Sequence, residues 1–257
     1  MNIKSTNEER TKEYFEKFNR EKTLKFLVNN DKPIIFDIGA NVGKTVDEFK
    51  NWWPESMIYC FEPQEECWDE LFLRENKFKT GKVYVNKFAL GNQNKTETFY
   101  THQMHSGISG FNKINLNSVD SVYLNKVLNE GKEDINNYKR IINHERSIGI
   151  RRVDDFINEQ ENFPKIIDLV KIDTQGFEPE VLDGFGEILK NVKVIITELM
   201  FYDYYERSLS FTAIEKYLLP SGFKLYDISH ISKNPMNGRT DWVDVVYENK
   251  FLRNKEI

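Results

Sequence analysis

The feature that most constrains the fold of this chain is an alternation of short apolar runs with segments of helical periodicity. The strand-like runs lie at residues 34–38, 57–61, 83–90, 166–172 and 192–199. The helical patterns between them cover about 43–53, 64–75, 178–190 and 210–219. Apolar runs of this length without polar alternation are typical of strands that are buried on both faces. The sequence therefore predicts an α/β fold with a mostly parallel sheet and helices on both faces.

The two ends of the chain extend this pattern. Residues 5–28 carry apolar side chains at helical spacing, so residues 1–32 are predicted to form an N-terminal helical cap on a domain that spans 33–257. Two further strand-like runs, 223–228 and 242–247, are separated by a polar connection of 13 residues without a helical pattern. Because a parallel crossover usually needs a helix, the last strand is expected to run antiparallel.

The alternation is interrupted before the run at 166–172. Residues 96–100 are predicted to form a further edge strand. Residues 112–150 are polar, rich in Asn and without a clear strand pattern, which predicts an insertion with helices around 118–130 and 133–146.

Composition restricts the classes of function. The chain has 257 residues with 36 Lys and Arg against 41 Asp and Glu, and a net charge of −5 does not suit binding to duplex nucleic acid. No apolar run approaches the roughly 20 residues of a membrane helix, and no leader pattern opens the chain. The two cysteines, Cys60 and Cys67, fit neither a disulfide scaffold nor a metal spacing. We expect a cytoplasmic protein without a membrane span or a metal; the sequence is compatible with a homodimer.

A glycine turn between the first strand and its helix is the sharpest local signal. It reads DIGANVGKT over residues 37–45. A P-loop needs four residues between its first glycine and Gly-Lys-Thr, and only three intervene here. A dinucleotide fingerprint needs glycines where Asn41 and Lys44 stand. Asp37 also disfavours a phosphate. Its carboxylate suits a ligand with a cationic end, such as S-adenosylmethionine, which carries an ammonium close to a sulfonium.

A second carboxylate supports a nucleoside ligand. Glu62 ends the second strand, 19 residues beyond Gly43. A carboxylate at this place can accept hydrogen bonds from both hydroxyls of a ribose. Each signal alone is weak, because an acid at a strand end is often a solvated or capping residue. Together they lie at consecutive strand ends of one parallel sheet, at the crevice where α/β proteins bind ligands.

These motifs resemble those of a known family. The pattern D-x-G-x-N-x-G resembles the first motif of class I methyltransferases. The blocks FDIGANVG, FEP, NKFALG, VKIDTQGFEPEVLDGF and VIITEL follow the order and rough spacing of the FkbM family of S-adenosylmethionine-dependent methyltransferases. The resemblance covers about 34–228. It implies a Rossmann-like sheet of seven strands and methyl transfer, usually to an oxygen of a sugar or natural product.

By position, the resemblance also implies which residues contact the cofactor. Those that would line S-adenosylmethionine are Asp37, Gly39, Asn41, Gly43 and Glu62, and those near its adenine are Ala89 and Leu90. Glycines allow a ligand to approach the backbone without a Cβ in the way. One departure is Gln175, where the family commonly has Glu.

Methyl transfer to a hydroxyl needs aligned partners and removal of a proton. Asp173 closes the strand at 166–172 and is a candidate base, metal ligand or clamp, or else the N-cap of the following turn. His105, in a loop after the third strand, is a candidate base or a solvated loop residue. No ligand motif supports a metal site between these two residues.

Two further acids and an aromatic run lie near the same strand ends. Glu178 is either functional or a first-turn helix acid favoured by the helix dipole. Glu198 is buried by pattern and must have a partner, because an unpaired buried acid is costly. Residues 201–205 follow the fifth strand, so Tyr202 is predicted to stack on an acceptor, unless the run is a helix-capping cluster.

A basic stretch closes the insertion. It contains Lys139, Arg140, Arg146, Arg151 and Arg152 within 14 residues, against one acid. Arginine offers a planar fork that matches phosphate or carboxylate. We therefore expect residues 112–150 to form a lid in which Arg140, Arg146 and Arg151 bind an anionic acceptor such as a phosphorylated sugar. The alternative is a solvated basic face that pairs with the acidic body.

The combined pattern predicts an S-adenosylmethionine-dependent O-methyltransferase acting on a sugar, a sugar-phosphate or a small phospho-metabolite in glycan or natural-product biosynthesis. A catalytically inactive cofactor-binding protein that binds a partner is the alternative. The intact glycine turn and Glu62 favour the enzyme. The acidic balance, and the absence of an N-P-P-Y-like tetrapeptide, count against a nucleic-acid methyltransferase.

Overall fold

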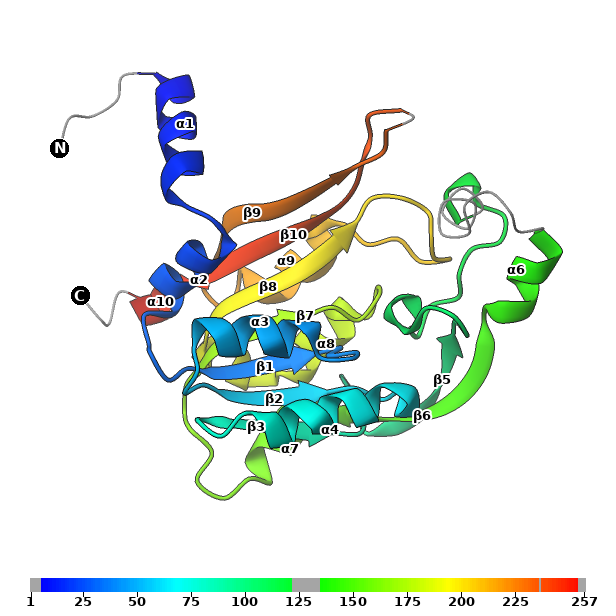
Figure 1. The fold of residues 1–257 in the computed structure, drawn as a ribbon, viewed down its shortest axis with the longest axis horizontal. Coiled ribbons are helices and arrows are strands. Elements are labelled where there is room, and N and C mark those ends of the chain that lie inside the picture. The colour runs from blue at the N-terminus through cyan, green and yellow to red at the C-terminus, as the bar shows by residue number, and fades with distance from the viewer. Residues whose placement is uncertain (1–5, 122–134, 236, 254–257) are drawn as a thin grey trace.

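The computed structural model describes residues 6–121, 135–235 and 237–253. Its centre is a sheet of seven strands in the order β3-β2-β1-β7-β8-β10-β9 (Figure 1). These strands are β1 (Ile34–Ile38), β2 (Met57–Phe61), β3 (Lys82–Asn86), β7 (Ile167–Ile172), β8 (Val192–Met200), β9 (Phe223–Lys233) and β10 (Thr240–Asn249). Neighbouring strands from β3 to β8 are parallel, and β10 is antiparallel to both of its neighbours. The predicted α/β fold with an antiparallel last strand is confirmed.

Helices cover both faces of this sheet. Along β1, Ile35 packs into one buried apolar cluster and Phe36 into another on the opposite face. The helices on the Ile35 side are α2 (Arg20–Val28), α3 (Lys44–Trp52) and α4 (Trp68–Lys77), and those on the Phe36 side are α7 (Val153–Asn158), α8 (Glu178–Gly184) and α9 (Phe211–Leu218). Because both faces need apolar side chains, the strands read as continuous apolar runs.

The N-terminal region forms two helices that pack differently. α2 buries Leu24 and Val28 in the core on the Ile35 side of the sheet. α1 (Asn7–Lys17) buries no side chain and projects from the body beside β9 (Figure 1). The Tyr14 hydroxyl of α1 donates to Asp227 Oδ2 of β9 at 3.1 Å. Of the two helices, α2 is thus the one that covers the sheet.

A smaller sheet of three strands corrects one sequence prediction. Its strands are β4 (Ala89–Gly91), β5 (Lys95–Thr101) and β6 (His144–Arg152), in the order β4-β6-β5. The predicted edge strand at 96–100 is β5. The predicted single strand at 83–90 is wrong, because β3 ends at Asn86 and β4 pairs with β6 in the other sheet. The run at 83–90 therefore contributes one strand to each of the two sheets.

The prediction for the insertion is also partly wrong. α6 (Ile135–Ile141) lies within the predicted helix at 133–146, but the chain from His144 onward forms β6. Of the helix predicted at 118–130, residues 119–121 are helical and residues 122–130 lie outside the described residues. The strand was missed because the charged side chains on β6 are exposed, and a strand with one solvated face tolerates charge there.

Short helical segments complete the structure. They are η1 (Glu65–Cys67), η2 (Ser106–Ile108), η3 (Gly186–Asn191) and α10 (Lys250–Arg253). Among the described residues, no helix has both the length and the apolar character needed to cross a membrane.

Candidate active site

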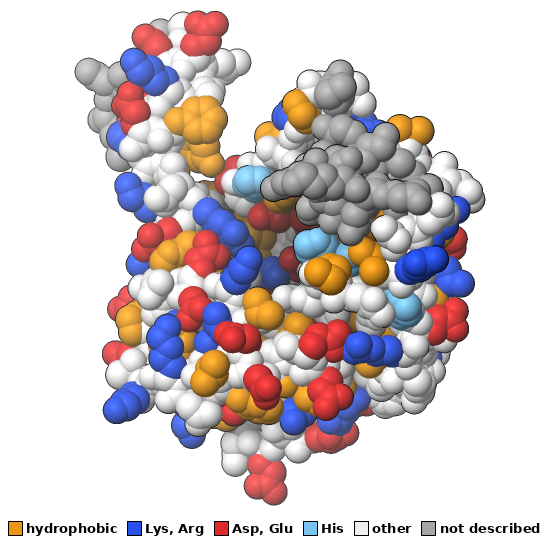
Figure 2. Space-filling model, turned by 45° about the vertical axis from the view of Figure 1, so that its right-hand side comes forward, with side chains coloured by type: hydrophobic (Ala, Val, Ile, Leu, Met, Phe, Trp, Pro, Cys, Tyr) orange, Lys and Arg blue, Asp and Glu red, His pale blue; other side chains and the backbone are white. Residues whose placement is uncertain are grey.

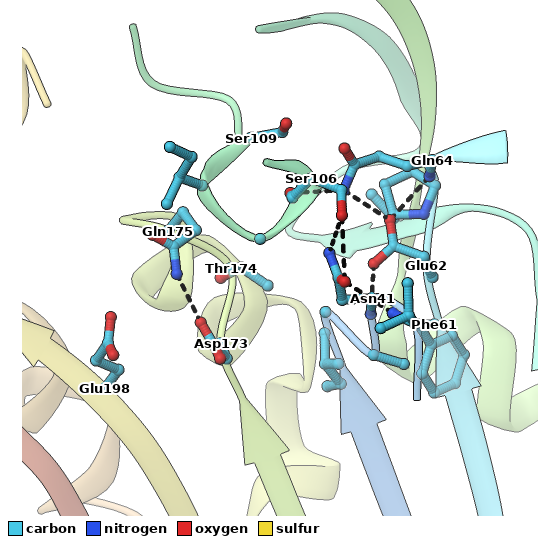
Figure 3. A pocket seen from close by; sticks show the side chains of 18 of the residues that line it. Asn41, Phe61, Glu62, Gln64, Ser106, Ser109, Asp173, Thr174, Gln175 and Glu198 are labelled. Carbon is cyan, nitrogen blue, oxygen red and sulfur yellow. Dashed lines mark hydrogen bonds between the residues drawn. The ribbon is translucent and has the colours of Figure 1, made fainter. Parts of the chain in front are cut away.

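A cavity of about 750 Å³ opens at the carboxyl ends of the parallel strands. Its walls come from the residues that follow β1, β2 and β7, from the end of β8 and from the segment around η2 (Figure 3). Figure 2 shows a hollow in the surface beside histidine side chains, with acidic and basic side chains visible inside it. The carboxyl edge of a parallel sheet is where α/β proteins bind their ligands. The cavity is therefore the candidate active site.

Gly39 and Gly43, in the turn after β1, have different structural roles. Gly39 lines the cavity at a φ of +81°, and a Cβ there would lie 1.9 Å from the backbone oxygen of Asp173. Gly39 therefore allows the ends of β1 and β7 to meet. Gly43 has a φ of +80°, and its Cβ would lie 2.6 Å from Arg74 Cδ of α4. This second glycine allows α3 and α4 to pack, and it is not part of the cavity wall.

Glu62 organises one end of the cavity. Its Oε2 accepts from the backbone N–H of Asn41 at 2.8 Å, and its Oε1 accepts from the backbone N–H of Gln64, also at 2.8 Å. Ser106 of η2 closes the network, because Asn41 Nδ2 donates to its Oγ at 3.0 Å and Gln64 Nε2 donates to its backbone oxygen at 3.1 Å (Figure 3). Burial raises the pKa of Glu62 to about 7, although the hydrogen bonds oppose that rise.

Asp37 lies deeper than the sequence suggests. It is fully buried in β1, between β2 and β7, and it does not line the cavity. Lys171 Nζ lies 3.6 Å from its Oδ1. Burial raises the pKa of Asp37, and the charge of Lys171 opposes this. In this structure Asp37 therefore reaches the cavity only through Lys171, which does line it.

Asp173 dominates the opposite end of the cavity. Its Oδ1 accepts from Gln175 Nε2 at 2.8 Å, and its Oδ2 lies 3.2 Å from Lys171 Nζ. Burial opposes the charge of Lys171, but the carboxylates of Asp173 and Asp37 raise the pKa of this ammonium above its usual range. No N-cap hydrogen bond from Asp173 is present among the described residues. The Asp173 carboxylate instead lies in the cavity wall, with Gln175 donating to Oδ1 and Lys171 donating to Oδ2.

Glu198, near the end of β8, is the second acid in this part of the cavity wall. Burial, together with the charges of Asp173 and Asp244, raises its pKa well above the usual range. The sequence predicted Glu198 to be buried with a partner, but it is half-buried in the cavity wall, and within the described ranges no side chain donates a hydrogen bond to its carboxyl group.

A comparison with known proteins identifies the family. A family model, that of the methyltransferase FkbM domain, matches residues 37–225. The chain belongs to the FkbM methyltransferase family. This confirms the resemblance predicted over about 34–228.

Two curated proteins are similar to this FkbM methyltransferase. The 2-O-methyltransferase NoeI of Sinorhizobium fredii is 26% identical over 196 residues, which cover 76% of this chain and 74% of NoeI. Methyltransferase 1 of Beauveria bassiana is 26% identical over 159 residues, or 61% of this chain and 60% of that protein. Among solved structures, the magnesium protoporphyrin IX methyltransferase from Synechocystis PCC 6803 matches with a TM-score of 0.46 and 8% identity, covering 97% of this chain and all of that one.

Several predicted site residues of the FkbM domain meet at the cavity. Ala89 and Leu90 are buried and line it, as do His105 and Tyr202. The neighbouring His102 is structural, because its Nδ1 accepts from the backbone N–H groups of Met104 and His105, both at 3.1 Å. Burial lowers the pKa of His102 to about 4.

The arginines of the predicted lid do not line the cavity. Arg146 Nη1 pairs with Glu66 at 2.6 Å, and Arg151 pairs with Glu159 while its guanidinium lies over the Phe88 ring. Arg140 is exposed on α6. Arg146 and Arg151 lie on β6, so this part of the insertion is a strand of the smaller sheet. Two of the three side chains thus follow the alternative reading, a basic face that pairs with acids.

Sequence reasoning missed several residues of the cavity wall, among them Gln64, Lys171 and Trp242. Lys171 carried a usable signal, because it precedes Asp173 by two positions along a strand and so points to the same side. Trp242 carried none, since it enters from β10, which joins the sheet next to β8.

Glu178 lies behind the turn that carries Asp173. Its Oε1 accepts from the backbone N–H of Thr174 at 2.9 Å, from the Thr174 hydroxyl at 3.1 Å and from the backbone N–H of Gly176 at 3.3 Å. The residue is 2% exposed, and burial raises its pKa from 4.5 to about 7. Glu178 therefore has a structural role as the acceptor that holds this turn.

We expect Glu178→Gln to make stability less dependent on pH. A folded-state pKa above the unfolded value gives stability that is present below about pH 4.5 and is lost as the pH rises through about 7. The glutamine oxygen can still accept, but the side chain cannot ionise. Between these pH values the native chain should lose on the order of 3 kcal/mol of unfolding free energy relative to the variant. Urea unfolding at pH 4.5 and pH 8 measures this; an equal difference at both pH values would contradict it.

Proposed function

We propose that this FkbM protein is an S-adenosylmethionine-dependent O-methyltransferase that acts on a hydroxyl group of a sugar or a similar small acceptor. The observation that carries the proposal is one cavity with two chemically different ends. One end has the Glu62 network at the tips of β1 and β2, and the other has Asp173 and Glu198 at the tips of β7 and β8. A nucleoside cofactor suits the first end, and an acceptor hydroxyl suits the second.

The residues at the first end fit S-adenosylmethionine. The volume of about 750 Å³ is within the usual range for small-molecule and cofactor sites. Glu62 would hold the ribose hydroxyls, with Asn41 and Gln64 beside it, while Ala89 and Leu90 offer an apolar surface to the adenine. When bound, the cofactor supplies a methyl group that its sulfonium has already activated. Asp37 lies behind the cavity wall, in an ion pair with Lys171.

The residues at the second end can take the proton of a hydroxyl group. Asp173 lines the cavity, and each of its two carboxyl oxygens contacts a donor of this chain. An ionised carboxylate beside the acceptor can accept its hydroxyl proton as the oxygen is methylated. The name of the relative NoeI, a 2-O-methyltransferase, agrees with an oxygen acceptor.

The charge of the second end favours an uncharged acceptor. Its ammonium group, that of Lys171, is already paired with two carboxylates. Arg146 and Arg151 are paired outside the cavity. A phosphate at this end would meet Asp173 and Glu198, while Lys44, the other described lysine that lines the cavity, begins α3 at the end that follows β1. We therefore propose a neutral hydroxyl-bearing acceptor in preference to a phosphorylated one.

Calorimetry and a transfer assay test this proposal. S-adenosylmethionine and S-adenosylhomocysteine are titrated into the protein, and methyl transfer from labelled cofactor is measured on neutral methyl glycosides and on matched sugar phosphates. We expect cofactor binding, and transfer to a neutral glycoside. Absence of cofactor binding would contradict the enzyme, and transfer to the phosphates alone would contradict the neutral acceptor.

We expect Arg146→Ala and Arg151→Ala to leave the acceptor KM within about twofold of the native value, since exposed ion pairs contribute little and neither residue reaches the cavity. A lid that grips an anionic acceptor would instead raise KM, and more strongly at low salt. KM for the best acceptor is measured at two salt concentrations, with Arg140→Ala alongside. A salt-dependent rise in KM in any of the three variants would instead support the hypothesis that residues 112–150 form a lid that binds an anionic acceptor.

A further inference from the structure

Gln175 has a backbone conformation that is unusual for its residue type. Its φ is +54°, in the left-handed region, and Gly176 follows at +92°. A residue with a side chain keeps such a conformation only where its surroundings hold it, and such residues are frequent at functional sites. Asn112 Nδ2 donates to the backbone oxygen of Gln175 at 3.2 Å. The turn after β7 is therefore held from the segment that follows η2.

The side-chain amide of Gln175 joins Asp173 to the aromatic segment after β8. Its Nε2 lies 2.8 Å from Asp173 Oδ1, and its Oε1 lies 2.7 Å from the hydroxyl of Tyr205 (Figure 3 shows the first contact). An ionised carboxylate can only accept, so the NH₂ group must face Asp173 and the carbonyl must face Tyr205. The Tyr205 hydroxyl also lies 2.9 Å from the backbone oxygen of Ile108, so its single hydrogen is shared between that oxygen and Gln175 Oε1.

The contact completes the fixation of the Asp173 carboxylate. Lys171 Nζ holds Oδ2 at 3.2 Å, and the amide holds Oδ1. We propose that Gln175 is a positioning residue for methyl transfer: its amide orients Asp173 toward the acceptor hydroxyl, and Tyr205 orients the amide. The proposal rests on the proposed function for its kinetic consequence. The contact itself can be tested without any acceptor.

The charge of position 175 matters because of this contact. A carboxylate there would have no hydrogen for Asp173 and would place a second negative charge against it. Among the described residues, the charged and titratable groups around the pair include Tyr205 after β8, Lys171 of β7, Asp37 of β1, Glu198 of β8, Asp244 of β10 and Glu178 of α8. These groups are common to every variant below, so differences between variants report on the pair.

Thermal unfolding at pH 5.5 and pH 8.5 tests the contact with three variants. Gln175→Glu should lose stability as the pH rises, because the two carboxylates can share a proton only at low pH, and its Tm should fall relative to native by an additional 3 °C or so. Gln175→Met, which has a similar size and no charge, should have a Tm that differs from the native Tm by the same amount at both pH values. The double variant with Asp173→Asn should regain stability at pH 8.5, because the hydrogen bond forms again with its polarity reversed.

Methyl transfer to the neutral glycosides tests the positioning role. We expect Gln175→Met, which removes the donor to Asp173 without adding a charge, to lower the rate at least tenfold with unchanged S-adenosylhomocysteine affinity. The double variant should recover stability without recovering turnover. Its carboxylate is at position 175, and position 173 at the end of β7 carries an amide that cannot take the proton of the acceptor. A Gln175→Met variant with native turnover, or a double variant that recovers turnover, would overturn the proposal. A native chain that transfers no methyl group would refute the proposed function, while the unfolding assay would still decide the contact.

Discussion

Asp173→Asn is expected to lower the rate of methyl transfer by about 10²–10⁴-fold, the usual cost of losing a general base. The asparagine has the same shape, but its oxygen cannot take the proton of the acceptor. It would also present its amide to two donors, Gln175 Nε2 and Lys171 Nζ, where the native carboxylate accepts at 2.8 Å and 3.2 Å. The affinity for S-adenosylhomocysteine should change by no more than about twofold, because the Glu62 network lies at the other end of the cavity.

Single-turnover rates with the best acceptor, and calorimetry with S-adenosylhomocysteine, measure the two quantities separately. Asp203→Asn is the matched control, since Asp203 follows β8 but is exposed and does not line the cavity. It should behave as native. Near-native turnover in Asp173→Asn would remove Asp173 from the chemistry, and an equal loss of cofactor affinity would move it to the cofactor site.

Glu62→Ala is expected to weaken S-adenosylhomocysteine binding on the order of 10²-fold. Hydrogen bonds to a charged group contribute about 1.5–3 kcal/mol each, and the carboxylate would receive them from the ribose hydroxyls. The substitution also removes the acceptor of the backbone N–H groups of Asn41 and Gln64, which loosens the turn that the cofactor would contact. Both effects act in the same direction.

The pH dependence separates the charge of Glu62 from its packing. With a pKa of about 7, its carboxylate is protonated below that pH and ionised above it. The ionised form accepts hydroxyl donors better, so native affinity should rise from pH 6 to pH 8, whereas Glu62→Ala should show no such rise. Glu65→Gln is the control, because Glu65 is exposed and only three residues away. A native affinity that is flat over this range, or an alanine variant that binds as well as native, would refute the ribose contact.

The sequence predicted the central sheet because strands that are buried on both faces are largely apolar. It also located the cavity, because the carboxyl ends of neighbouring parallel strands meet at one edge. Gly39, Glu62 and Asp173 follow directly from that rule, each being at or just beyond the end of a different strand. The rule uses only positions along the chain.

The sequence did not predict which strands pair with one another. The run at 83–90 was predicted to form one strand, yet β3 pairs with β2 and β4 pairs with β6. Residues 144–146 were predicted to end a polar helix, yet they begin a strand whose pairing with β5 supplies backbone hydrogen bonds. That pairing also directs Arg146 and Arg151 away from the cavity, although their composition suggested an anion site.

The sequence by itself determined the residue types at the strand ends, and the tertiary structure decided what each can do. Asp37 and Glu62 are both strand-end acids in sequence, but Asp37 is enclosed between two strands beside Lys171, whereas Glu62 lies in the cavity wall. In the sequence, Gln175 was noted only as a neutral residue where the family commonly has Glu. In the structure, its side-chain amide donates a hydrogen bond to Asp173. Burial and hydrogen bonding depend on neighbours from distant parts of the chain, and those neighbours exist only once the sheet has formed.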